Sequence, residues 1–282
     1  MPTTPSGSLR RAIASTGARW SLLLLGMMLA AIVFGPVIRP VDPNALDLAN
    51  AAAPPSVAHP LGTDESGRDV MARLLYGGRV SLAVGLASVV CSLMVGISLG
   101  TVAGTHRGTV DAVVMRFTDA MLSIPTIFLV IAALTFLGAS TVGLIAAIGA
   151  TSWMGLARLV RGEMLSLREQ PFVEASRALG APEARVAWRH VLPHVVPSIV
   201  ITATLGVGTA ILTESALSFL GLGVQPPAAS WGNMLSGAQN YLASTPRLAL
   251  FPGLSIVATV VAINVLGDAM RDALEPSGAS PR

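Results

Sequence analysis

The side chains that could carry out chemistry are few in this sequence, and their spacing argues against an enzyme. All 18 lysine-plus-arginine positions are arginine, so no Walker A lysine can hold the phosphates of ATP and no lysine can form a Schiff base. His190 and His194 have the i, i+4 spacing of zinc ligands, but no glutamate lies between them as in H-E-x-x-H. Cys91, the one cysteine, lies in an apolar run and is predicted to be a packing residue. We therefore expect no catalytic residue, no metal site and no cofactor in this chain, so that any ATP-driven work is done by a partner.

Composition indicates a membrane protein. Hydrophobic residues make up 52% and charged residues 12% of the 282 positions, and the mean hydropathy is +0.69. A soluble globular protein carries roughly 25% charged residues. The formal net charge of +3 is spread between the apolar runs, so it forms no basic patch for nucleic acid. We expect a multi-pass protein of the cell membrane with no nucleic-acid partner.

Charge-free runs of about 20 apolar residues locate the spans, because a helix of that length crosses the hydrocarbon layer. The run at residues 120–157 would be about 57 Å long as one helix, so Gly138–Thr141 is expected to divide it into two spans. Prolines and polar residues break the uncharged run between Ser215 and Pro246, where we expect re-entrant or interfacial structure, with a seventh span as the alternative. The six predicted spans are residues 20–38, one helix within 79–106, two within 120–157, 194–213 and 248–267. Pro125, Pro197 and Pro252 are expected to kink the third, fifth and sixth of them.

The arginines predict the orientation. If both ends of a six-span chain are inside, thirteen arginines are cytoplasmic and five are outside, as the positive-inside rule requires. The basic residues and apolar run at the N-terminus could also be a signal peptide. A retained first helix is favoured, because the run is long enough to span and the small residues at 49–51 lie too far beyond it.

The long inner loop, residues 158–192, is predicted to contain two short helices. Pro171 suits the first position of a helix, and Gly180 is placed to end that helix in a left-handed conformation. Pro182 and Glu183 are expected to begin the second helix. Apolar residues repeat at helical spacing in the first helix, at Phe172, Ala175 and Leu179. This pattern alone leaves two interpretations open: a helix resting on lipid headgroups, or a docking element for a soluble partner.

The inner loop also resembles a known motif. Glu174-Ala175-Ser176 is followed after three residues by Gly180 and, after nine more, by His190-Val191-Leu192-Pro193. This is similar to the EAA motif of ABC-importer permeases, E-A-A-x3-G-x9-I-x-L-P, with Ser176 at its third position and His190 in place of the isoleucine. In that family the loop docks into a groove of the ATPase, so the resemblance favours docking. It implies a coupling loop whose contact residues are Phe172, Glu174, Ala175, Arg177, Ala178, Gly180 and Pro193.

Further segments are similar to the peptide/nickel family of these permeases, and within it to DppC/OppC-type subunits. The segments are Leu61–Val70, Arg116–Pro125, Ala216–Gly223, Gln225–Pro227 and Trp231-Gly232. The resemblance implies an all-α, polytopic fold of the type I ABC-importer permeases, with six transmembrane helices and both termini cytoplasmic. It implies import of di- or oligopeptides, with nickel chelates as the alternative substrate.

The resemblance also implies partners and a division of the chain. The partners are a second, homologous permease of the DppB/OppB type, two ATPase subunits or one fused ATPase that bind ATP and Mg²⁺, and an extracytoplasmic substrate-binding protein. The expected parts are a cytoplasmic tail (1–19), a first transmembrane helix (20–38), an extracytoplasmic loop (39–77), a permease core of five helices (78–271) that includes the cytoplasmic coupling loop (158–192), and a second cytoplasmic tail (272–282).

Ionisable residues in or near the spans are candidates for the translocation pathway. Asp119 lies near the inner end of the third predicted span and Glu214 at the outer end of the fifth. Each has a simpler alternative. Arg116 and Asp119 are spaced i, i+3 for a local ion pair, and Glu214 can simply reach the interface.

Glycines repeat at a spacing that lets helix backbones approach closely. Gly96, Gly100 and Gly104 form two overlapping G-x-x-x-G patterns in the second predicted span. We expect this face to pack against another helix of the chain or against the second permease.

Other function classes fit the sequence less well. Secondary transporters place ionisable groups at the membrane midplane in broken helices, whereas the predicted spans are almost free of charge at mid-depth. An intramembrane hydrolase is disfavoured because only four histidines could act as a base: His59 lies in the outer loop, His106 in a short inner loop, and His190 and His194 lack the glutamate of H-E-x-x-H. A permease subunit of an ABC importer is the preferred interpretation.

Overall fold

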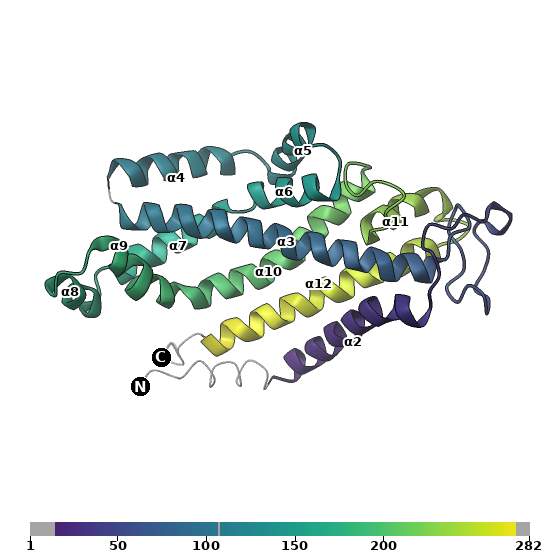
Figure 1. Ribbon diagram of the computed structural model, residues 1–282, viewed down its shortest axis with the longest axis horizontal. Coiled ribbons are helices and arrows are strands. Elements are labelled where there is room, and N and C mark those ends of the chain that lie inside the picture. The colour runs from purple at the N-terminus through teal and green to yellow at the C-terminus, as the bar shows by residue number, and fades with distance from the viewer. Residues whose placement is uncertain (1–14, 107, 275–282) are drawn as a thin grey trace.

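The computed structural model describes residues 15–106 and 108–274, which are mostly helical (Figure 1). Within these two ranges no β-sheet forms, and Thr63 and Asp69 make an isolated bridge. The helices are α2 (Thr16–Ile38), α3 (Val70–Thr105), α4 (Thr109–Leu122), α5 (Thr126–Leu137), α6 (Thr141–Thr151), α7 (Met154–Leu167), α8 (Pro171–Ala178), α9 (Glu183–Arg185), α10 (Leu192–Phe219), α11 (Trp231–Ala238) and α12 (Arg247–Leu274), with short 3-10 segments η1 (Leu48–Asn50) and η3 (Gln239–Tyr241) and a π-helical segment η2 (Val186–Val191).

Within the described residues, five helical segments are long and apolar enough to cross a membrane. They are α2, α3, the α6–α7 segment Thr141–Leu167, the segment Glu183–Phe219 that joins α9, η2 and α10, and α12. Helices α4 and α5 pass the same test only as a pair, bent by 96° at the break between them. When that pair is counted as one broken span, the number is the predicted six.

The third span follows the prediction both at its turn and at its kink. The turn that separates it from the fourth lies where the sequence indicates: Gly138 has a φ of 82°, and Ser140 Oγ caps α6 by accepting a hydrogen bond from Gly143 N at 3.0 Å. The span itself is broken at residues 123–125. Pro125 disfavours a helical conformation at the preceding Ile124 and has no N–H to donate, so α4 ends and α5 starts in a new direction.

The long helices pack side by side (Figure 1). Helix α2 lies against α12, α12 against α10, α10 against α3, and α3 against the α6–α7 segment, while α5 packs on α6. Helix α8 lies at one end of this bundle and α11 at the other (Figure 1), and we refer to these as the α8 end and the α11 end. Helix α2 begins and α12 ends toward the α8 end.

The segment before α3 is held by one buried carboxylate. Asp69 begins α3 by accepting a hydrogen bond from Ala72 N at 2.8 Å, which satisfies a free N–H of the first turn. The same carboxylate lies 3.0 Å from Arg39 Nη2 and 2.9 Å from His59 Nδ1. Helix α3 therefore starts at Val70, earlier than the predicted core boundary at residue 78.

The uncharged region after α10 is not a seventh span. Its helix α11 has 8 residues, far fewer than the roughly 20 that a crossing requires. Ser230 and Asn233 form a reciprocal capping box at its start. Trp231 is buried and donates a hydrogen bond from its ring N–H to Leu74 O at 3.0 Å, so α11 is fixed against α3.

Candidate functional site

The α8 loop, residues 168–182, connects α7 to α9 and forms the tip of the α8 end. Pro171 occupies the first turn of α8, where a missing N–H costs nothing. Beyond the helix, Gly180 has a φ of 80°, Gly180 N donates to Arg177 O at 2.8 Å, and Ala181 N donates to Ser176 O at 3.2 Å. This six-to-one bond around a left-handed glycine is a Schellman cap. The helix thus begins and ends where the sequence predicts.

The second helix of the loop is not independent, contrary to the prediction. Helix α9 begins at Glu183 as expected, but it continues through η2 into α10 as one segment, Glu183–Phe219, of 37 residues. Helix α7 extends to Leu167. The connecting loop is therefore shorter than the predicted range 158–192, and α8 is joined through α9 to a long helix.

One side chain anchors α8 to the bundle. Val173 is fully buried and packs in a cluster with Val160 and Met164 of α7 and with Val186 and Val191 of η2. Burying a valine side chain contributes about 1.5–3 kcal/mol. Because Val173 faces inward, the opposite face of α8 is presented to the surroundings.

An arginine and a glutamate lock the two ends of the loop. Arg168 Nη1 donates to the last carbonyls of α3, Gly104 O at 3.1 Å and Thr105 O at 2.6 Å. Glu183 Oε2 lies 3.5 Å from Arg168 Nη2, and the Glu183 carboxylate accepts two hydrogen bonds from Arg177, at 2.7 and 3.2 Å. Such a bidentate pair is among the stronger side-chain contacts. The orientation of α8 is thereby fixed relative to α3 and α9.

The outward face of the α8 end mixes large apolar and charged side chains. The exposed fractions of Phe172, Leu179 and Trp188 are 39%, 89% and 57%, and Phe172 stacks on His194 with ring centroids 5.0 Å apart. Glu174, Ala175, Ala178, Gly180 and Pro193 are also exposed. A short helix with this surface is suited to a groove on another protein. Of the predicted contact residues, Arg177 is the exception, because its guanidinium is used within the loop.

Two ion pairs hold α4 beside α7. Arg161 donates to both oxygens of Asp111, at 2.5 and 2.6 Å, and Arg158 Nη2 lies 2.5 Å from Asp119 Oδ1. Asp119 is thus paired with Arg158 of another helix. This differs from the local pair with Arg116, one turn away, that the spacing predicts. Both partners of this pair are about half exposed. A pathway role for Asp119 stays a prediction.

Glu214 is buried inside the chain, so it does not line an open mouth at the α11 end. Its carboxylate accepts hydrogen bonds from the hydroxyls of Ser81 at 3.1 Å, Ser215 at 3.3 Å and Ser218 at 2.7 Å. In turn, Ser81 Oγ accepts from the backbone N–H of Trp231 at 3.1 Å, and Ser218 Oγ accepts from Val224 N at 3.0 Å. We call these the Glu214 network. It joins α3, α10 and the segment leading into α11.

The glycine repeat of α3 lies against α7 of the same chain. A methyl group added at Gly100 would come within 2.7 Å of Ala157 O and Val160 Cβ, and one at Gly96 within 3.0 Å of Trp153 O. At Gly104 it would meet Met164 Cβ at 2.8 Å. Of the two expected packing partners, the structure thus places a helix of this chain against the repeat.

The described residues contain no group of three His, Cys, Asp or Glu side chains placed to hold a metal ion. The zinc-like spacing of His190 and His194 has a local use instead, since Nδ1 of His194 lies 2.8 Å from the backbone oxygen of His190.

The sequence relatives identify the family of this helical chain. Residues 96–278 match the family described as "Binding-protein-dependent transport system inner membrane component". The chain belongs to this family of permease subunits. It is therefore an inner-membrane permease subunit of an ABC importer.

Curated permeases resemble the chain over most of its length. It is 41% identical to the glutathione transport system permease protein GsiD of Pectobacterium atrosepticum over 90% of this chain and 85% of the relative. The corresponding values are 39%, 90% and 84% for the dipeptide transport system permease protein DppC of Alkalihalophilus pseudofirmus. They are 38%, 90% and 84% for the oligopeptide transport system permease protein OppC of Bacillus subtilis.

A solved structure confirms the permease fold. The chain matches a chain of the inward-facing methionine ABC transporter MetNI with a TM-score of 0.61 at 21% identity, covering 73% of this chain and 98% of the other. At this identity the likeness establishes the fold alone.

Sequence patterns do not reveal several of the residues that fix the α8 loop of this permease. Val173 lies next to Phe172 in an apolar pair, and only the packing shows which one faces inward. Arg168 and Glu183 are 15 positions apart, beyond the i, i+4 rule that reveals ion pairs on a helix. One feature of the sequence does point to this ion pair: several arginines surround Glu183, which stands at the start of a predicted helix.

Proposed function

We propose that this permease forms half of the translocation pathway of an ATP-driven importer of short peptides. The names of the relatives refer to glutathione, dipeptides and oligopeptides, which are peptides or a peptide derivative. The proposed partners are a second, homologous permease, two ATPase subunits or one fused ATPase that bind ATP and Mg²⁺, and an extracytoplasmic binding protein. The α8 end faces the cytoplasm and the α11 end faces the binding protein.

The observation that carries the coupling role is the combination of a fixed backbone and an exposed surface in the α8 loop. Val173 and the Arg168–Glu183 contact hold α8 in one orientation, while Phe172 and Leu179 remain available to a partner. A protruding helix held in this way can transmit a displacement of the ATPase to the helix bundle. Phe172, Glu174, Ala175, Ala178, Gly180 and Pro193 form its proposed contact surface, with Arg177 as an internal support.

The proposed pathway wall is a groove of about 310 Å³ between α3, the α6–α7 segment and α10. Its lining is mostly apolar and contains no charged side chain, and each of the three elements also contributes a hydroxyl group, those of Ser88, Ser92, Ser152, Thr202 and Thr209. Thr202 also lines a second groove, which continues toward the α8 end. A wall without charged side chains suits a path that must let peptides with different side chains pass, because it does not select for a charge.

Topology is the first test. Reporter fusions after residues 20, 108, 175 and 278 should report the cytoplasm, and fusions near residues 55 and 230 the opposite side. The reason is the excess of arginines in the segments assigned to the inside. An external signal at residue 175 would contradict the proposal, since the α8 loop must lie on the side of ATP.

Energy coupling is the second test. The purified chain should hydrolyse no ATP, because it contains no lysine to bind the phosphates. Hydrolysis should appear when the ATPase subunits and the second permease are assembled with it, and the ATPase should co-purify with this chain. ATP turnover by the isolated chain, with contaminating ATPases excluded by mass spectrometry, would reject the assignment.

A further inference from the structure

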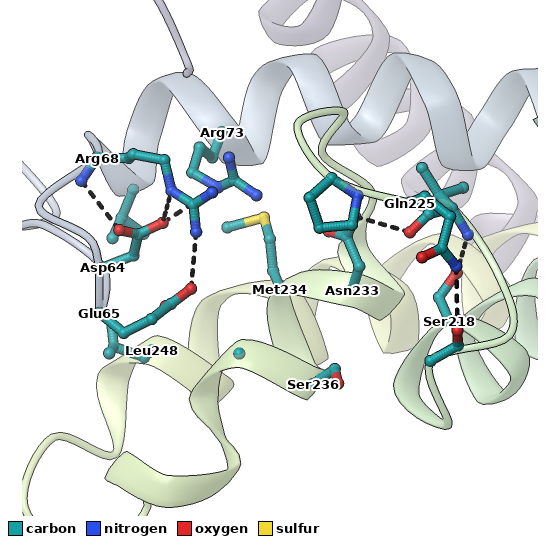
Figure 2. A pocket seen from close by; sticks show the side chains of 15 residues that line it. Asp64, Glu65, Arg68, Arg73, Ser218, Gln225, Asn233, Met234, Ser236 and Leu248 are labelled. Atoms are coloured by element: carbon teal, nitrogen blue, oxygen red, sulfur yellow. Dashed lines mark hydrogen bonds and ion pairs between the residues drawn. The ribbon is translucent and has the colours of Figure 1, made fainter. Parts of the chain in front are cut away.

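A charged cavity of about 300 Å³ lies at the α11 end, away from the α8 loop and from the groove proposed as the pathway wall. It is enclosed by the segment before α3, the start of α3, the segment after α10, and α11. Figure 2 shows four charged side chains at one end of it, Asp64, Glu65, Arg68 and Arg73, and uncharged polar groups such as Gln225 at the other. Its volume is at the lower end of the range of small-molecule sites.

Asp64 has a structural role in this cavity, and both of its carboxylate oxygens already accept hydrogen bonds. Its Oδ1 accepts the backbone N–H groups of Ser66 and Arg68, both at 2.9 Å. Its Oδ2 accepts from Arg68 Nε at 2.7 Å and lies 3.3 Å from Arg73 Nε. Because all of these contacts are internal, Asp64 fixes the two arginines and leaves nothing for a ligand.

Arg73 and Glu65, in contrast, can each make a further hydrogen bond. Arg73 is buried, and besides its contact with Asp64 it donates only from Nη1, to Pro43 O at 3.2 Å. Glu65 Oε1 accepts from Arg68 Nη2 at 2.7 Å. Neither Arg73 Nη2 nor Glu65 Oε2 has a hydrogen-bond partner among the residues that the structure describes. Both side chains line the same cavity.

A buried guanidinium with a free donor and a carboxylate with a free oxygen favour a ligand that supplies both opposite charges. The two acidic and two basic side chains cancel, so a simple anion or cation gains little here. Gln225 lies at the far end of the cavity (Figure 2) and donates from Nε2 to Gly221 O and Gly223 O, both at 3.0 Å, so it takes no part in binding the two charges.

We propose that this cavity binds the zwitterionic form of a short peptide, its carboxylate at Arg73 and its ammonium group at Glu65. The inference rests on the proposed function and deepens it. It assigns a peptide-binding site to the permease itself, on the side where the binding protein is proposed to dock.

The test uses the importer complex of both permeases and the ATPase in nanodiscs, without the binding protein. Alanyl-alanine should give a saturation-transfer difference NMR signal. N-acetyl-alanyl-alanine and alanyl-alanine amide, which each lack one charge, should bind at least tenfold more weakly. Ser236→Phe, which places an aromatic ring in the cavity, should abolish the signal. Asn240→Phe, on an exposed residue just beyond α11, is the matched control and should retain it.

A second variant separates recognition from folding. Glu65→Gln keeps an oxygen for Arg68 but removes the charge that would meet the ammonium group. It should weaken alanyl-alanine at least tenfold and leave the weaker binding of N-acetyl-alanyl-alanine unchanged, which a general disturbance of the structure would not do.

The inference is overturned if alanyl-alanine does not bind, if both capped forms bind as tightly as alanyl-alanine, or if Ser236→Phe has no effect. Peptide transport by the complete importer with its binding protein is measured in parallel. Transport without binding at this cavity would reject the inference and leave the proposed function standing, whereas an importer that carries no peptide would reject the proposed function itself.

Discussion

Replacing Gly180 with valine is expected to abolish transport while the protein still inserts into the membrane at near-normal abundance. Gly180 has a φ of 80°, and a side chain added there would meet nothing within 4 Å, so the whole effect comes from the backbone. A β-branched residue in this region costs about 1–3 kcal/mol. The turn would relax, α8 would change its direction relative to α9, and Glu174 and Phe172 would no longer reach the ATPase. Transport and co-purification of the ATPase should be measured together.

Two controls sharpen this experiment. Gly108→Val imposes the same kind of strain, since Gly108 has a φ of 87° and equally open surroundings, but it lies before α4 and should leave ATPase binding intact. Gly180→Asn should retain most transport, because asparagine tolerates the left-handed region. Glu174→Arg, which reverses a charge on the exposed face without straining the turn, should reproduce the loss of coupling. If Gly180→Val transports normally and still brings down its ATPase, the role assigned to the α8 loop is wrong.

Replacing Glu214 with leucine is expected to lower the stability of the protein more than any exposed substitution. The change removes the common acceptor of three hydroxyl groups in the Glu214 network, and a buried polar group left without a partner costs about 1–3 kcal/mol. Thermal unfolding of the purified chain should shift to lower temperature, and the environment of Trp231, followed by fluorescence, should change first. Asp268→Leu, at an exposed position of α12, should change stability by no more than about 0.5 kcal/mol.

Glu214→Gln distinguishes a structural from a transport role. The amide keeps one oxygen for the serine hydroxyls, so its unfolding temperature should lie between those of the wild type and Glu214→Leu, and transport should persist in proportion to folded protein. Normal stability combined with complete loss of transport would contradict the structural role and return Glu214 to the pathway.

The features that the sequence predicts well are those fixed by neighbouring residues. Pro171 and Gly180 set the ends of α8 through their own backbone preferences, and Gly138 marks the turn after the third span. The long apolar runs determine where the spans lie, because a helix needs a minimum length to cross the bilayer however it packs.

What the sequence does not predict depends on residues that meet only after folding. Asp119 finds Arg158 rather than Arg116 because α4 lies along α7. Glu214 turns inward because three serines offer it hydroxyls, one of them 133 positions away. The break at Pro125 is predicted locally, because the proline itself disfavours a helical conformation of the residue before it; what the sequence does not predict is its size, a bend of 96° between α4 and α5.

The continuous segment from Glu183 to Phe219 acts mechanically as a lever. Its irregularities, the π-helical turns of η2 and the internal Pro197, lie toward the α8 end, and such places are where helices bend. From Pro197 to Glu214 the helix is about 26 Å long, so a tilt of about 10° at the proline would carry Glu214 about 4–5 Å sideways. That is longer than any hydrogen bond in the Glu214 network. Either the network breaks, or α3 and the segment leading into α11 move together with α10. In the second case, a displacement of the α8 loop changes the shape of the charged cavity at the opposite end of the bundle.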